Sequence, residues 1–379
     1  MTRIGPRALA KTGIAAVLHW SGAARALGAV AGWQSTPPVI TYHRVVPDFA
    51  ASAQHTVPAM LVSRQMLEQH LDWLGRRFRF VSLDELGSRL EDGGAFERPV
   101  AAVTFDDGYR DVYEHAFPLL KRKGIPAAVF VVTGLIGTTD LHLHDRLYLL
   151  LARALSVGGS ARRDVGHSLV ELGVRSLTLD RMNGAGRDPV TVARALLDHF
   201  PQAEVLRISD GLEAQLGLDH QDALNSLLPL TWEMLAEMHR AGMTIGSHSK
   251  THALLTNEPA RTVLDETAGS RWKLERRLGI RIDHFAYPAG RFDSSVVSAV
   301  AASGYRFGYT TCPHRDRARP LLTIPRRVFW QNCCLNAFGR FSSTMIDCQV
   351  KGPFDFRARC RQEHARRRSE GAARVAEHR

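Results

Sequence analysis

The sequence has no cysteine pair with CxxC spacing and no long apolar run. Its five cysteines are an odd number, and Cys333 and Cys334 are adjacent, which makes a poor disulfide framework and a poor cysteine zinc site. No stretch reaches the ~18 apolar residues that span a membrane. We therefore expect mostly structural thiols in a reducing compartment, and neither a disulfide-built scaffold nor a membrane-spanning protein.

Acidic residues are also in the minority. The chain has 49 Lys and Arg against 38 Asp and Glu, a net charge of +11. Much of this excess lies in residues 350–379, which we predict to be a basic, flexible tail. The tail is either simply solvated or a patch for anionic lipid or an acidic polymer. Without a recognition motif beside the charge, we expect no specific nucleic-acid partner.

Residues 1–36 are predicted to form an amphipathic helical segment. Charged residues interrupt its apolar core, so it differs from a signal peptide. Four apolar side chains would share one helical face: Val17, Trp20, Ala24 and Leu27. The segment is either an interfacial helix on an anionic membrane or an ordinary packed helix. We expect a cytoplasmic protein, with peripheral association at the inner membrane as the open alternative.

Residues 37–349 alternate short apolar strands with amphipathic helices, which is typical of a parallel α/β barrel. The rhythm changes at about residues 145–229. This stretch contains helical pieces and few β-branched runs. We predict a largely helical insertion that caps the barrel, with a separate small domain as the alternative.

Imidazoles and carboxylates follow the predicted strands at the barrel end where active sites lie. Asp106 and Asp107 end one strand, and His248 and His252 follow another. The two histidines are four residues apart, so their rings can reach one metal, and one carboxylate would complete the ligand set. The metal's charge would offset the repulsion between the adjacent aspartates.

Three motifs carry a resemblance to a known family: TFDDG at 104–108, HSxxH at 248–252 and YPxG at 287–290. Together they resemble the polysaccharide deacetylases of carbohydrate esterase family 4, whose homology region is shared by rhizobial chitooligosaccharide deacetylases. TYHRV and FRFVSLDEL resemble a branch associated with exopolysaccharide gene clusters. The resemblance covers roughly residues 37–330 apart from the insertion, and it implies an α/β fold, a distorted (β/α)7 barrel.

The resemblance also implies roles for individual residues. Asp106 would be the general base, and a backbone N–H at Tyr109 would stabilise the oxyanion. The ligands of a divalent metal, usually Zn²⁺ and sometimes Co²⁺ or Ni²⁺, would be Asp107, His248 and His252. Tyr287, Pro288 and Gly290 would shape the sugar pocket, with Pro288 as a simple strand terminator the alternative. The implied enzyme removes N-acetyl groups from N-acetylhexosamine units of a bacterial surface polysaccharide or its lipid-linked precursor, by attack of a metal-bound water.

The sequence departs from the family pattern at two positions. The arginine that pairs with the catalytic aspartate is replaced by Ala286, and we consider Arg291 a candidate substitute. The late motif that supplies a histidine as general acid reads LTIPRR at 322–327, without one. Three candidates for the acid remain: His43, His144 and Asp106 itself. The alternatives are that His43 is a core histidine bonded to backbone and that His144 belongs to a surface loop. We favour a role for His43, at the end of the first strand.

Other residues and other functions stay open. Trp232 and Trp330 either stack on a sugar or belong to the core, and Arg326 and Arg327 either bind a substrate anion or are solvated. Since one fold serves several reactions, another amide or ester hydrolase, such as an O-deacetylase or a cyclic amide hydrolase, is an alternative. A catalytically weak glycan-binding homologue is a further one.

Overall fold

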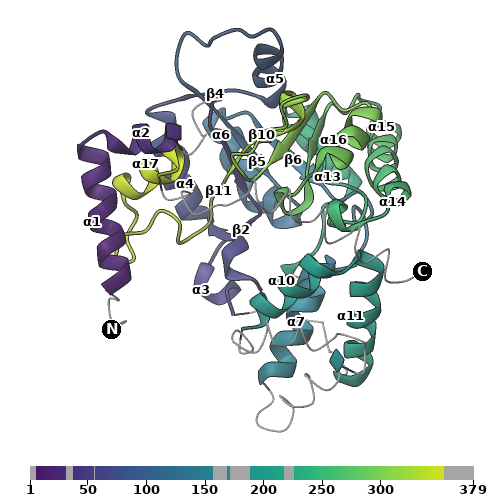
Figure 1. Cartoon of the computed structure of the whole chain (residues 1–379). Helices are drawn as coiled ribbons and strands as arrows, with labels where there is room; N and C mark the ends of the chain where they lie inside the picture. Colours follow the sequence, from purple (N-terminus) through teal and green to yellow (C-terminus); the bar gives the residue numbers. More distant parts are fainter. Residues whose placement is uncertain are drawn as a thin grey trace.

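The computed structural model describes residues 6–30, 37–54, 56–156, 169–170, 188–216 and 226–353. Its centre is a parallel sheet, seen in Figure 1, in which neighbouring strands are linked by helices. Six strands run through it in the order β9, β8, β7, β6, β5, β1. They are β1 (Val39–Tyr42), β5 (Val100–Phe105), β6 (Ala127–Val131), β7 (Thr244–Ser247), β8 (His284–Ala286) and β9 (Phe307–Thr310).

The sheet closes through one late segment of the chain. β10 (Ile324–Pro325) pairs with β9, and β11 (Arg327–Val328) pairs with β1, both in parallel. Only Arg326 separates these two short strands, so the segment changes neighbours at that residue. If β10 and β11 are counted together as one strand, this strand is the seventh of the barrel. The predicted α/β fold, a distorted (β/α)7 barrel, is therefore confirmed.

Shorter strands extend the barrel at its edges. β4 (Arg79–Phe80) pairs with the start of β5, and β2 (Arg44–Val46) pairs with β3 (Leu61–Ser63) in a separate sheet. Short helical turns also occur: α3 (Phe49–Ser52), η1 (Pro58–Met60), η2 (Val112–Ala116), η3 (Leu255–Asn257), η4 (Asp265–Gly269), η5 (Pro288–Gly290) and η6 (Pro320–Leu322). The helices of the barrel are α4 (Arg64–Gly75), α5 (Leu83–Glu91), α6 (Phe117–Lys123), α13 (Trp232–Arg240), α14 (Ala260–Leu264), α15 (Ser270–Leu278) and α16 (Ser294–Ala302).

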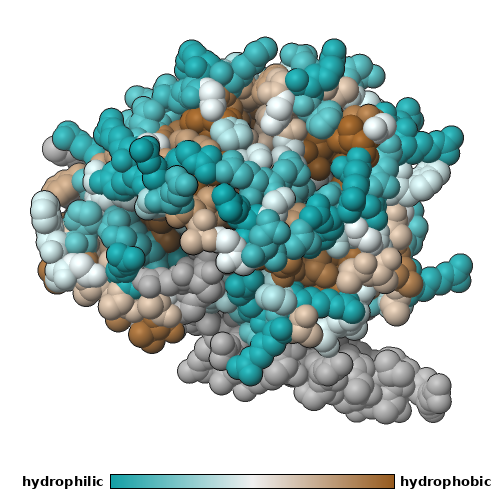
Figure 2. Space-filling view, turned by 90° about the horizontal axis from the view of Figure 1, so that it is seen from above, coloured by the Kyte–Doolittle hydropathy of each residue, from teal (hydrophilic) through white to brown (hydrophobic). Residues whose placement is uncertain are grey.

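The sequence specifies where several of these helices begin and end. Ser82 caps α5 by accepting a hydrogen bond from the N–H of Glu85 at 3.1 Å, and Thr231 caps α13 in the same way. Gly124 ends α6 with a left-handed φ of 63°. All six residues of β5 are buried, as expected for a central parallel strand. Figure 2 shows hydrophilic side chains over most of the face drawn there, with apolar residues in separate patches.

Within the predicted insertion, the described residues form three helices, α7 (Leu143–Ser156), α10 (Pro189–His199) and α11 (Gln202–Leu216). They lie together at one side of the barrel (Figure 1) and share a hydrophobic cluster of their own, which includes Leu150, Leu196 and Ile208. We call these three helices the cap. Their helical character agrees with the prediction. Of the predicted insertion, residues 157–168, 171–187 and 217–225 lie outside the described residues.

The N-terminal segment is helical, but it forms two helices rather than one. α1 (Pro6–Trp20) and α2 (Ala23–Val30) are separated at Gly22, whose φ is 73°. Both contact α17 (Ser343–Lys351), and His19 Nδ1 lies 2.8 Å from Asp347 Oδ2. The predicted common apolar face is therefore wrong, because Trp20 is 81% exposed while Ala24 is buried.

Several apolar side chains of α1 and α2 remain exposed: Leu9, Ile14, Val17, Trp20 and Val30. An interfacial role for this segment stays a prediction. Among the described residues, no helix combines the length and the apolar character that crossing a membrane requires. Most of the predicted basic tail, from residue 354 onward, lies outside the described residues.

Candidate metal and catalytic site

A tight turn after β5 points the two adjacent carboxylates in different directions. The N–H of Gly108 bonds to the carbonyl of Asp106 at 2.9 Å, and Asp107 has a left-handed φ of 71°. His252 adopts a similar φ of 65° in the loop after β7. Non-glycine residues rarely adopt such a φ, and when they do it is often at a functional site.

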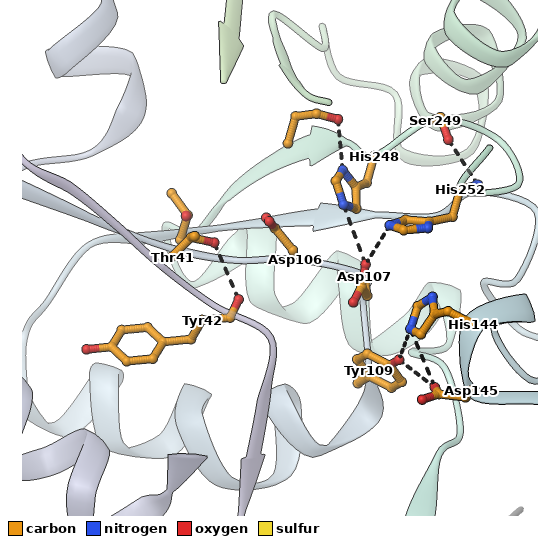
Figure 3. A network of polar contacts seen from close by, with 12 residues as sticks. Thr41, Tyr42, Asp106, Asp107, Tyr109, His144, Asp145, His248, Ser249 and His252 are labelled. Atoms are coloured by element: carbon orange, nitrogen blue, oxygen red, sulfur yellow. Dashed lines mark hydrogen bonds and ion pairs between the residues drawn. The ribbon is translucent and has the colours of Figure 1, made fainter. Parts of the chain in front are cut away.

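Asp107, His248 and His252 converge at this end of the barrel (Figure 3). One oxygen of Asp107 lies 3.5 Å from Nε2 of His248 and 3.3 Å from Nε2 of His252. His248 donates from Nδ1 to the carbonyl of Ala286 at 2.8 Å, which leaves its Nε2 lone pair facing Asp107. The three donor atoms lie within 4.8 Å of one another, close enough to share one ion.

The electrostatics of Asp107 support a cation at this position. Neither of its carboxylate oxygens has a hydrogen-bond partner among the described residues, although the side chain is buried. Burial raises the pKa of Asp107 well above its usual range, and the nearby carboxylates of Asp106 and Asp145 raise it further. A buried, unpaired carboxylate is costly unless a positive charge joins it, and a divalent metal would supply that charge.

Asp106 has a charged partner that the sequence analysis did not identify. Arg326, at the junction of β10 and β11, donates to both of its oxygens at 2.7 Å. Burial alone would raise the pKa of Asp106, but Arg326 and His248 lower it to about 2. Asp106 is therefore held as a carboxylate, which is the form that a general base requires.

This pairing corrects two expectations. Arg291, considered as the substitute for the arginine lost at Ala286, lies instead 2.8 Å from Asp198 of the cap. Arg326 is 0% exposed and Arg327 is 5% exposed, so neither is a solvated side chain. Arg326 reaches Asp106 from a different strand than the family motif uses, which sequence spacing does not reveal.

The Arg326→Met variant is expected to be less stable than the wild type by about 3–5 kcal/mol, because it leaves the Asp106 charge buried and unpaired. Urea unfolding of the metal-free proteins would measure the difference. The same substitution made on top of Asp106→Asn should cost clearly less. Equal costs in both backgrounds would contradict an energetic coupling between the two side chains.

Two of the general-acid candidates, His43 and His144, line the same cavity but differ in their contacts. His43 is half-buried in the site, and its Nδ1 has no hydrogen-bond partner among the described residues. Burial lowers the pKa of His43 to about 4. His144 belongs to a network instead: its Nε2 lies 2.8 Å from the hydroxyl of Tyr109, which donates to Asp145 at 2.6 Å. The Tyr109 side chain thus supports His144 and does not line the cavity described next.

A cavity of about 500 Å³ opens beside these residues, between the barrel and the cap. Asp106, Asp107, His248 and His252 line it, together with both His43 and His144. The predicted pocket residues Tyr287, Pro288 and Gly290 line it as well, and so does Trp330. Trp232 does not; it packs at the edge of the core, with Arg277 over its ring at 5.4 Å.

Local backbone geometry holds the predicted pocket residues in place. The hydroxyl of Tyr287 donates to the carbonyl of Leu322 at 2.8 Å. Gly290 has a φ of 66°, and a Cβ there would lie 2.0 Å from Thr311 Oγ1. Glycine is therefore required at this position of the YPxG motif by both conformation and space.

The adjacent cysteines lie away from this cavity. Cys333 and Cys334 are buried next to His70, with their sulfur atoms 3.3 Å apart. The hydroxyl of Tyr42 lies 3.3 Å from Nδ1 of His70, inside the main hydrophobic core. Their burial fits the expectation of structural thiols, and none of these residues lines the cavity.

The fold and the donor set together define a barrel protein with a buried Asp–His–His site beside a paired aspartate. The family model for polysaccharide deacetylase matches residues 93–308, which is more than half of the chain. The chain therefore belongs to the polysaccharide deacetylase family.

Two relatives illustrate the range of similarity. The poly-β-1,6-N-acetyl-D-glucosamine N-deacetylase of Staphylococcus epidermidis is 31% identical over 111 residues, which are 27% of this chain and 38% of that protein. The Bacillus subtilis protein YxkH is 20% identical over 310 residues, 81% of this chain and 76% of that protein. The match to the first relative thus spans well under half of its length.

Solved structures support the fold. The Streptococcus pyogenes deacetylase PplD, determined with acetate, has a TM-score of 0.50 at 18% identity and covers 80% of this chain and 96% of that one. IcaB from Ammonifex degensii has a TM-score of 0.50 at 19% identity, covering 83% and 97%. At these identities the likeness concerns the barrel and not the substrate.

Proposed function

We propose that this protein is a metal-dependent N-deacetylase that acts on N-acetylhexosamine units of a bacterial surface polysaccharide or its lipid-linked precursor. The observation that carries the proposal is the ionised Asp106, paired with Arg326, beside the Asp107–His248–His252 group in one cavity. A glycan-binding homologue would have no need of this second, separately paired carboxylate. The family membership and the N-deacetylase named among the relatives support the same reaction.

Asp107, His248 and His252 would hold the metal, and Zn²⁺ suits their oxygen and imidazole donors, with Co²⁺ or Ni²⁺ as alternatives. When bound, the metal would supply Lewis-acid activation of water and of the acetamide carbonyl. The hydrogen bond from His248 Nδ1 to Ala286 fixes the ring so that Nε2 points into the site.

The chain's own residues would move the protons. Asp106 would accept the proton of the attacking water, and Arg326 keeps it ionised and fixed in orientation for that step. The departing amine needs a proton, and His43, whose Nδ1 is unpartnered in the cavity, is our candidate to deliver it. Its low pKa leaves the ring neutral at first, so it would pass on the proton that Asp106 has taken from the water. The backbone N–H of Tyr109 is the predicted oxyanion donor.

The His43→Ala variant is expected to lower kcat by about 10²-fold, a usual size for the loss of a general acid. KM should change much less, because the side chain would act mainly in the transition state. Steady-state kinetics on a soluble acetylated sugar would measure both constants. If His43→Ala keeps full turnover, the proton comes from elsewhere, and the matching His144→Ala variant becomes the next test.

The experiment for the proposed function is to incubate the zinc-loaded protein with N-acetylglucosamine glycosides and measure acetate and free amine together. Equal amounts of both products would support an N-deacetylase. If an O-acetylated sugar releases acetate and no new amine appears, the protein is an O-deacetylase. If a cyclic amide is opened and no acetate appears, it is a cyclic amide hydrolase. Binding of sugars without any product would leave a glycan-binding homologue.

A further inference from the structure

The cavity extends well beyond the catalytic residues. Its volume of about 500 Å³ runs from Asp106 and the metal-ligand group to the underside of the cap. Six half-buried apolar side chains line this extension and form what we call the apolar wall: Val57, Leu143, Val190, Leu197, Phe200 and Leu254. Three of them come from α7 and α10, so the cap supplies much of the wall.

The polar groups near the wall are largely engaged with the protein itself. The carboxylate of Asp198 accepts from Arg291 at 2.8 Å. The side chain of Gln202 donates to the carbonyl of Thr251 at 2.9 Å, and its backbone N–H donates to Glu258 at 2.7 Å. Two further polar side chains of the cap line the cavity: Arg194, which is exposed, and Tyr148, which is buried. Few polar groups therefore remain to bind a ligand here.

This composition decides what can occupy the extension. A second sugar carries several hydroxyl groups, and each one buried without a hydrogen-bond partner costs free energy. An apolar chain has no such requirement and gains free energy from every methylene group removed from water. Ligand pockets commonly combine a few convergent polar groups with an apolar lining. Here the polar groups lie at the catalytic residues, and the apolar side chains form the wall of the extension.

We propose that the apolar wall is a binding site for an apolar group joined to the acetylated sugar, so that the substrate is an amphiphile rather than the interior of a long polysaccharide. This inference rests on the proposed function, because the reacting acetamide is placed at Asp106 and the metal-ligand group. The cap would select the substrate by binding the part that does not react.

The test compares three compounds on the zinc-loaded protein: the methyl and hexyl glycosides of N-acetylglucosamine, used as monomers in solution, and the N-acetylglucosamine tetrasaccharide. We expect kcat/KM for the hexyl glycoside to exceed that for the methyl glycoside at least tenfold, and to exceed that for the tetrasaccharide. Equal values for the two glycosides, or a preference for the tetrasaccharide, would overturn the inference.

Two matched variants locate the effect. Leu197→Asn places an amide on the apolar wall, whereas Leu206→Asn makes the same change on α11 at a side chain that is 39% exposed and outside the cavity. The first should reduce the hexyl preference to below threefold with little change for the methyl glycoside, and the second should retain it. If Leu197→Asn does not fold, Val190→Thr makes a smaller polar change on the same wall.

Calorimetric binding to the Asp106→Asn variant separates the two proposals. Suppose that the wild type releases acetate from no glycoside, but the variant still binds the hexyl compound at least tenfold more tightly than the methyl compound. The proposed function then fails and the apolar site stands. If acetate is released from both compounds at equal rates and both bind equally, the N-deacetylase stands and the apolar site is wrong.

Discussion

The Asp106→Asn variant is expected to retain its metal and to lose about 10³-fold in kcat, which is within the range for removing a general base. The substitution preserves the size of the side chain but removes the charge that accepts a proton. The reason is specific to the structure: Asp106 is buried, it is bound through both oxygens by Arg326, and its pKa is about 2. It is thus a carboxylate throughout the neutral range.

The measurement is kcat together with metal content by mass spectrometry. We expect one metal per chain in both wild type and variant, and a KM that changes little. A loss of metal in Asp106→Asn would contradict the assignment, since it would make Asp106 a ligand. Activity within tenfold of the wild type would contradict the role of general base.

Much of the fold could be predicted from periodicity and end signals. The run 100–105 is the strand β5 residue for residue, and Ser82 and Thr231 cap helices as their spacing indicates. The closing segment was missed because β10 and β11 are only two residues each. A run of two residues is too short to show the alternation of apolar and polar side chains that marks a strand. Only the pairing with β9 and β1 defines this segment as a strand.

The candidate site, like the fold, could be predicted from the sequence only in part. Each metal-ligand candidate follows a strand and belongs to a recognisable motif, so the sequence could place Asp107, His248 and His252 together. Arg326 has no such local signal, because its partner Asp106 is 220 residues away in the chain. A basic residue in LTIPRR is normally solvated, and only the closure of the barrel turns its side chain inward. The apolar wall is likewise formed by segments that touch only after folding.

The Asp107→Asn variant makes the same change, Asp to Asn, at the neighbouring residue. Unlike Asp106→Asn, it should lose its metal. It removes one of three predicted ligands, so we expect the metal to fall from one per chain to near zero after dialysis, with acetate release below detection. Adding zinc in excess should restore little activity, because the neutral amide is a weak ligand. Retention of a full metal complement would contradict the proposed ligand set.

Thermal unfolding of the metal-free proteins should also distinguish the Asp106→Asn and Asp107→Asn variants. Asp107 is buried among other carboxylates and has no hydrogen-bond partner among the described residues, so replacing it with Asn removes an uncompensated charge. Metal-free Asp107→Asn should therefore melt above the metal-free wild type. Asp106→Asn leaves the Arg326 cation unpaired and should melt below it. A lower melting temperature in both variants would mean that Asp107 has a stabilising partner in the metal-free state, and the case for a cation at that carboxylate would be lost.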